Sequence, residues 1–195
     1  MNQVAGLKTL HAAASTNLVQ RMGLVLDHLV SALGEDPSAP LRRAQILVDI
    51  DAHPGTTQSE IMDRLAIPKS TMNREIEWLY DHGCIVRQMS FSRGADGRSV
   101  PLETLGYAKK NLELALHYAD HSYNNLQNFL ECIIRMFTDP KPTLRDAKIL
   151  VAAADLGEAS RQELFARSYN GPPTTNARAL ESLMEQGLLV SKSEE

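Results

Sequence analysis

Apolar residues recur at steps of three or four over residues 4–33 of the chain. That spacing predicts an amphipathic helix, and Gly34 with the following EDPSAP segment is a typical helix stop. A second apolar run, residues 44–50, ends at the turn-forming sequence His-Pro-Gly of residues 53–55. The pattern therefore predicts a long helix, a sharp turn and a shorter helix.

Two further short helices and a pair of strands are predicted next. Thr57, with Glu60 three residues later, forms a capping box that opens a helix through Leu65. Pro68 fits the first turn of the following helix, which stops at His82-Gly83. Residues 84–86 are apolar and β-branched, as in a short strand. The glycines of residues 90–99 are placed for a hairpin tip, and residues 100–102 form the expected returning strand.

Helical spacing resumes over residues 103–137 and predicts a second long helix. The segment TDPKPT at residues 138–143 follows as a linker with two prolines. We therefore expect residues 1–137 to form one domain and residues 143–195 a second, smaller unit.

The second unit repeats the pattern of residues 41–86. Leu41, Ile46 and Glu60 align with Leu144, Ile149 and Glu163, and the glycine Gly83 aligns with Gly187. Each copy is predicted as helix, short helix, helix, glycine and strand. Two such copies favour two helix-turn-helix units over a solenoid of helix pairs. The expected core of the second copy includes Ile149, Leu150, Leu164, Leu180, Leu183 and Leu188.

The helix after Pro68 has a polar, basic front and an apolar rear. In a helix-turn-helix, the second helix of the pair lies in the major groove with its N-terminal residues against base edges. Its N-terminus also favours phosphate, because free N–H groups point outward there. Met72, Ile76 and Leu79 are the expected rear, while Trp78 fits either the core or a partner surface. The candidate DNA-binding residues at the front are Lys69, Ser70, Thr71, Asn73 and Arg74.

With these elements in order, residues 2–137 resemble the MarR family of winged-helix transcription regulators. The resemblance rests on a long N-terminal helix, the helix-turn-helix, and the wing pattern Asp96, Arg98, Leu102 and Gly106. It implies a mainly α fold: a winged helix-turn-helix with long dimerisation helices, followed here by a second, smaller winged-helix-like unit. It also implies a homodimer with recognition helices in successive major grooves and wing arginines near the minor groove.

Further candidates lie on the predicted wing and in the second unit. Arg87, Arg93 and Arg98 are either DNA contacts of the wing or solvated loop charges. In the second unit, DNA contact and a packing or protein-binding role stay equally open, because two prolines precede the helix and only one arginine follows. Its candidates are Thr174, Thr175, Asn176 and Arg178.

Composition narrows the choice of function. The formal net charge of −4 is a mild argument against nucleic acid, although a basic face can coexist with an acidic remainder. The two cysteines form no disulfide framework, and His117 and His121 lack a third metal ligand. No apolar run is long enough for a membrane span, and no enzyme motif stands out.

We therefore expect a cytoplasmic, cofactor-free homodimeric regulator, not an enzyme, that binds a palindromic operator in double-stranded DNA. A partner protein at the C-terminal unit is a further expectation. The alternative is a tandem winged-helix protein-interaction module, such as an accessory protein of chromosome or plasmid segregation or of replication.

Overall fold

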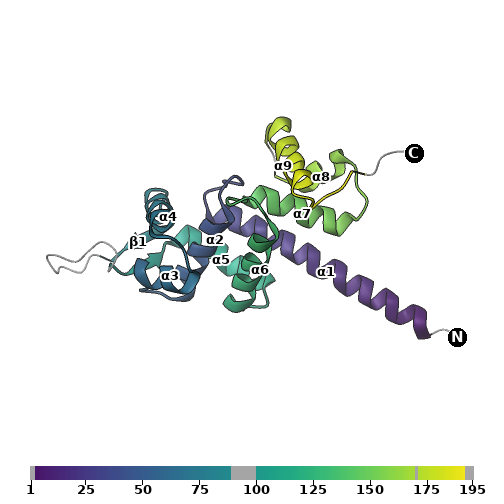
Figure 1. The fold of residues 1–195 in the computed structure, drawn as a ribbon. Helices are drawn as coiled ribbons and strands as arrows, with labels where there is room; N and C mark the ends of the chain where they lie inside the picture. The colour runs from purple at the N-terminus through teal and green to yellow at the C-terminus, as the bar shows by residue number, and fades with distance from the viewer. Residues whose placement is uncertain (1–2, 89–99, 170, 192–195) are drawn as a thin grey trace.

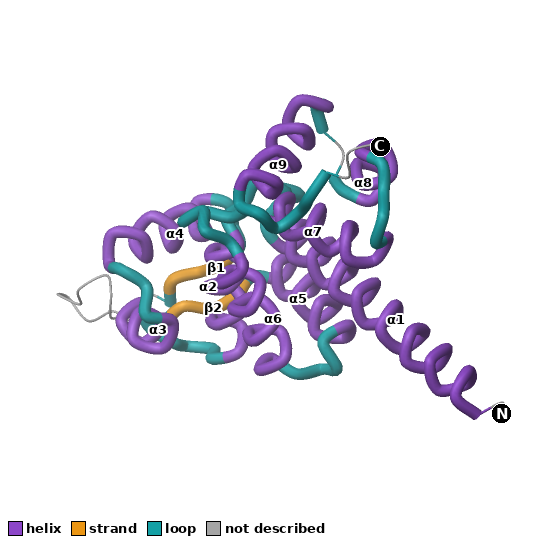
Figure 2. Tube along the Cα trace, turned by 45° about the vertical axis from the view of Figure 1, so that its right-hand side comes forward, coloured by secondary structure: helices purple, strands orange, loops and turns teal. Residues whose placement is uncertain are grey.

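The computed structural model describes residues 3–88, 100–169 and 171–191, with residues 3–17 described by their backbone. The fold is mainly helical with one small two-stranded sheet, as predicted for the class (Figure 1). In chain order the elements are α1 (Gln3–Ala32), α2 (Leu41–Ala52), α3 (Gln58–Leu65), α4 (Lys69–Asp81), β1 (Ile85–Arg87), β2 (Leu102–Thr104), α5 (Gly106–Tyr118), α6 (Tyr123–Met136), α7 (Leu144–Leu156), α8 (Arg161–Arg167) and α9 (Pro173–Glu185). The N-terminal turns of α1 project past all other helices (Figures 1 and 2).

Local sequence determines where α3 begins and how the chain turns from α3 into α4. The Thr57 backbone N–H donates to the Glu60 carboxylate at 2.7 Å, and the Thr57 hydroxyl accepts from the Glu60 amide, so the predicted capping box is confirmed. Helix α3 ends at Leu65, and the following residue, Ala66, adopts the left-handed conformation with φ of 50°. Pro68 is the residue immediately before α4, one position earlier than predicted. The left-handed Ala66 and Pro68 therefore end one helix and begin the next within a short turn.

The sheet pairs β1 with β2 in antiparallel register. Ile85 lies opposite Thr104, and the β2 strand begins at Leu102, slightly later than predicted. A further bridge joins Leu102 to Thr56, ahead of α3, with the Leu102 amide donating to the Thr56 carbonyl at 2.8 Å. The base of the sheet is thereby attached to the α2–α3 turn. The connecting segment that contains the predicted hairpin tip lies outside the described residues.

The predicted helix over residues 103–137 is broken, so that prediction was wrong. Asp120 and His121 both have φ of 55°, which ends α5 and starts the turn to α6. Arg21 on α1 stabilises the break, since its Nε and Nη2 donate to the Tyr118 carbonyl at 3.0 and 2.8 Å. The Ser122 hydroxyl then caps the first turn of α6. A distant arginine thus satisfies a carbonyl that a continuous helix would have bonded internally.

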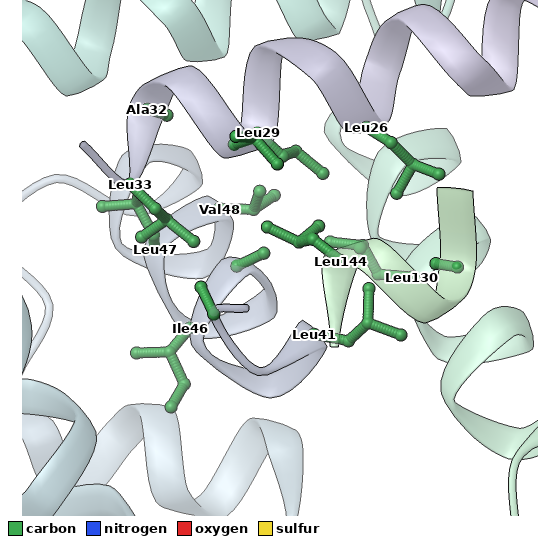
Figure 3. Packing of buried hydrophobic residues seen from close by; sticks show 14 of the residues in the cluster. Leu26, Leu29, Ala32, Leu33, Leu41, Ile46, Leu47, Val48, Leu130 and Leu144 are labelled. Carbon is green, nitrogen blue, oxygen red and sulfur yellow. The ribbon is translucent and has the colours of Figure 1, made fainter. Parts of the chain in front are cut away.

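A single hydrophobic cluster extends from α1 through α2 and α6 into α7–α9. Figure 3 shows Leu29 of α1, Val48 of α2 and Leu144 of α7 turned toward one another, and all three have 0% exposed surface. Backbone bonds add to this contact: the Leu41 amide donates to the Pro142 carbonyl, and the Leu144 amide to the Ala39 carbonyl. The C-terminal unit therefore packs on the rest of the chain, while the division into residues 1–137 and 143–195 stays a prediction.

The C-terminal unit has three helices, like the α2–α4 segment. Capping boxes open α7 at Thr143 and α8 at Ser160. Among its predicted core residues, Leu150 and Leu188 are half-buried, and the others are buried, namely Ile149, Leu164, Leu180 and Leu183. The strand predicted after Gly187 is absent from described residues 188–191, so that prediction was wrong. Residues 188 and 189 form a bend instead, and residues 190 and 191 have no regular structure.

Candidate nucleic-acid interface

Helix α4 has two distinct faces. Met72, Ile76 and Leu79 are at most 1% exposed and pack into the core, as predicted. Because these residues fall at helical spacing, the opposite side of α4 must face solvent. Of the predicted contact residues, Thr71 is half-buried and the others are exposed, namely Lys69, Ser70, Asn73 and Arg74. The structure brings these five side chains together on the first two turns of the helix.

The N-terminus of α4 is open. Pro68 precedes the helix and makes no side-chain hydrogen bond to its first turn. An uncapped helix start leaves backbone N–H groups for water or an anion. Lys69, at this end, has no ion-pair partner among the described residues. A phosphate approaching the first turn would therefore meet both N–H groups and a cation.

Two arginines at the exposed front of α4 form ion pairs with glutamates: Arg74, on the helix, and Arg87, on the neighbouring strand β1. Arg74 donates through Nε and Nη2 to one Glu75 oxygen at 3.0 and 2.8 Å. Arg87, at the end of β1, pairs with Glu77, and its guanidinium lies over the Tyr80 ring at 4.7 Å from the centroid. The face is consequently less basic than its arginine count suggests. The predicted wing residues Arg93 and Arg98 lie outside the described residues.

Behind the front of α4 lies a charged group that the sequence analysis did not single out. Glu75 is 1% exposed, and its second oxygen accepts from Arg43 Nε of α2 at 2.8 Å. The Arg43 guanidinium lies 3.8 Å from the Trp78 ring centroid, and Trp78 stacks on His82. Trp78 therefore belongs to this cluster. The sequence does contain a signal for this buried charge. Glu75 lies at helical spacing between Met72 and Leu79, on the apolar side of the helix.

Asn73 is also held from behind. Its Oδ1 accepts a hydrogen bond from Nε2 of Gln58, a 7% exposed residue near the start of α3. Gln58 was not singled out from the sequence either. The bond fixes the side-chain orientation of an otherwise exposed asparagine, so α3 contributes to the α4 face without itself being exposed there.

The corresponding helix of the second unit, α9, has a different front. Thr174 and Arg178 are exposed and Thr175 is half-buried. Asn176, however, is only 5% exposed; its Oδ1 accepts from Arg145 and its Nδ2 donates to the Tyr169 carbonyl. Its amide is satisfied inside the unit and does not face a ligand, so we remove Asn176 from the candidate DNA contacts.

An apolar groove lies between α1, the α5–α6 turn, α6 and α7. It encloses about 480 Å³. Two of its lining side chains are half-exposed although apolar, Leu18 at 51% and Met136 at 50%. Cys132 is exposed beside them, whereas Cys84 is buried and burial raises the pKa of its thiol. The groove is lined mainly by Leu18, Met22, Val25, Phe129, Ile133, Met136, Leu150 and Val151.

Comparisons with protein-family models, with curated proteins and with solved structures find no match to this chain. Within the described residues, no helix is both long and apolar enough to cross a membrane. No group of three or more His, Cys, Asp or Glu in those ranges is arranged to hold a metal ion; His117 and His121 contact each other edge to face.

Proposed function

We propose that this protein is a sequence-specific DNA-binding transcription regulator of the winged-helix type, with α3 and α4 as its helix-turn-helix. The observation that carries the proposal is the division of α4 into a buried apolar rear and an exposed polar front at an uncapped N-terminus. A recognition helix needs this arrangement, because base edges and phosphates are met by the first turns while the rear holds the helix in place. The β1–β2 pair supplies the base of the wing.

We further propose that the regulator acts as a homodimer on a palindromic operator. Residues 4–14 of α1 carry apolar side chains at steps of three or four, and this part of the helix projects past the body (Figures 1 and 2). An isolated projecting helix with such a stripe gains stability by burying it. The groove with half-exposed Leu18 and Met136 offers the matching apolar surface on a second copy. Two copies would then present two α4 helices to one duplex.

A protein-interaction module is the second candidate. Two observations favour it: Arg74 and Arg87 are each paired with a glutamate, and the chain is net acidic at −4. Both reduce the attraction to phosphate that supplies most nonspecific DNA affinity. On this reading, the front of α4 meets a protein and the tandem units serve as docking modules.

Selection of bound fragments from a pool of random duplexes, at a stated salt concentration, separates the two candidates. A DNA-binding regulator is expected to enrich sequences with an inverted repeat, and the enriched duplex should bind with a stoichiometry of two chains. A pool that emerges without enrichment, together with no shift of labelled duplex at low salt, overturns the DNA proposal. The reverse-charge variant Lys69→Glu serves as a control that should lose binding without unfolding.

A further inference from the structure

The carboxylate of Glu75 lies between two guanidinium groups from different sides. Arg43 on α2 approaches one oxygen from inside the protein, and Arg74 approaches the other from the exposed front. Glu75 itself is 98% buried at its side chain, and Arg43 is 90% buried. A buried carboxylate with two cations is a rigid arrangement, because releasing either arginine leaves a buried charge with too few partners. Glu75 therefore connects the core to the front of α4.

The bond geometry determines what Arg74 can offer to a ligand. Glu75 occupies the Nε side of the Arg74 guanidinium, through Nε and Nη2. The Nη1 group of Arg74 has no hydrogen-bond partner in the part of the chain that the structure describes, and Nη2 keeps a second N–H. These two nitrogens form the fork that bonds O6 and N7 of guanine in bidentate fashion. The side chain is 56% exposed, so the fork is accessible.

The second unit lacks this arrangement. In the alignment of the two copies, Asp146 takes the place of Arg43 and Ala179 the place of Glu75, and Arg178 takes the place of Arg74. Asp146 is used in the capping box of α7. Within the described residues, the carboxylate held between two arginines thus occurs only in the copy whose helix front is the more polar and basic of the two.

We propose that Glu75, anchored by Arg43, is a positioning residue that orients Arg74 to recognise a guanine in the major groove. The proposal rests on the DNA-binding function proposed above. Without the carboxylate, Arg74 becomes a flexible cation that contacts phosphates as readily as bases, since a long side chain loses rotamer freedom only when held. The consequence is a loss of sequence preference rather than a loss of affinity for DNA in general.

The test uses the full chain with Glu75→Gln, and the duplex most enriched from the random pool as probe. Preference for guanine over other bases at one position should fall by roughly tenfold, as expected for the loss of one bidentate contact. Binding to random duplex should stay equal or rise, because one negative charge is removed. The same tenfold loss is expected for Arg74→Ala, and the double variant should lose no more than either single one.

Glu77→Gln is the matched control, since it removes the same charge from an exposed residue of the same helix. It should strengthen binding to all duplexes and leave the guanine preference unchanged. If Glu75→Gln unfolds the protein, the double variant Arg43→Gln with Glu75→Gln removes both buried charges and is expected to show the same loss of preference. Unaltered guanine preference in a folded Glu75 variant overturns the inference while leaving DNA binding intact. A parent protein that enriches no sequence overturns the proposed function itself, and this inference with it.

Discussion

Lys148 of α7 donates to both carboxylate oxygens of Asp27 on α1, at 2.7 and 2.8 Å, and also to the Gly23 carbonyl at 2.9 Å. The lysine side chain is 13% exposed, whereas Asp27 is 41% exposed. Three hydrogen bonds thus anchor a nearly buried ammonium group where the C-terminal unit meets the long first helix. The contact couples the stability of the two parts of the chain.

Replacing Lys148 with methionine is expected to lower the free energy of unfolding by about 1–2 kcal/mol. Charge-assisted hydrogen bonds to a partly buried lysine have this magnitude once the exposure of Asp27 is allowed for. Urea unfolding monitored by circular dichroism measures the change. Lys141→Met, in the exposed linker, is the matched control and should change stability by less than about 0.5 kcal/mol. Equal effects of the two substitutions would mean that the α1–α7 ion pair contributes nothing.

The capping box of α3 gives a second stability prediction. Thr57→Ala removes a side-chain acceptor for the Glu60 amide and should cost about 1 kcal/mol, the usual value for a lost N-cap. The hydrogen bonds from Thr57 also lower the pKa of Glu60, so this part of the stability is present at neutral pH and is lost as the pH falls through that lowered pKa. Thermal unfolding of Thr57→Ala and the exposed control Thr174→Ala, compared at neutral and acidic pH, checks both points. The difference between the two variants should shrink in acid.

These local elements were accessible from sequence because their causes are local. Thr57 and Glu60 are three residues apart, and the spacing of apolar residues along α1 and α4 fixes which faces are buried. The break between α5 and α6 was not accessible, since neither Gly nor Pro marks it and the residue that stabilises it, Arg21, lies 97 positions away from Tyr118. A sequence feature was nevertheless present in Ser122, a good N-cap residue inside the apolar pattern.

The same distinction between local and distant causes applies to the candidate site. The front of α4 follows from helical spacing, and so does its rear. The interactions behind it do not, because Arg43 and Gln58 reach Glu75 and Asn73 from other helices. Asn176 was wrongly predicted as a contact residue because its side chain is polar. In the alignment of the two copies it takes the position of Met72, which lies on the buried side of α4, and Asn176 is buried as well. Alignment of the copies by burial pattern would have placed it correctly.

His28 gives a pH-dependent prediction. Its ring stacks on Tyr118, and burial lowers its pKa from the ordinary value of 6.5, against an opposing effect of Asp27. A histidine with a lowered pKa in the folded state is kept neutral there, while the unfolded chain binds the proton more readily. The contribution of neutral His28 to the free energy of unfolding is therefore fully present above the ordinary pKa of 6.5. That contribution is lost as the pH falls through the lowered pKa of the folded state. Substitution His28→Gln should make stability less sensitive to acid over this window.

Urea unfolding of the parent and of His28→Gln at several pH values on both sides of 6.5 measures this slope. The exposed His117→Gln variant controls for the loss of one histidine from the same region. A parent and a His28→Gln variant with parallel pH profiles would remove His28 as a cause of acid sensitivity.

The groove makes a prediction about association. Met136→Glu places a charge on a half-exposed apolar side chain of the groove, and a charge there cannot be desolvated cheaply by a docked helix. We expect the parent to be dimeric at micromolar concentration and Met136→Glu to shift it toward the monomer, as measured by light scattering. Val190→Glu, at a 91% exposed position away from the groove lining, should leave the dimer intact. A monomeric parent would exclude the homodimer altogether.

Lys69 tests the part of the interface that does not depend on sequence recognition. It lies at the uncapped start of α4 and, within the described ranges, has no acidic partner, in contrast to Arg74 and Arg87. A lysine that contacts one phosphate releases about one counterion, so Lys69→Ala should reduce the slope of log K against log salt by about one for each α4 bound. The loss should be the same on the selected operator and on random duplex, because phosphate contacts carry no base information.

Asn73→Ala is the contrasting variant: it should weaken operator binding by about 1–3 kcal/mol and leave the salt slope unchanged. Binding measured over a series of salt concentrations separates the two effects, with the linker variant Lys141→Ala as control. If both α4 variants match the parent on both duplexes, the front of α4 does not contact DNA, and the protein-interaction alternative replaces the proposed function.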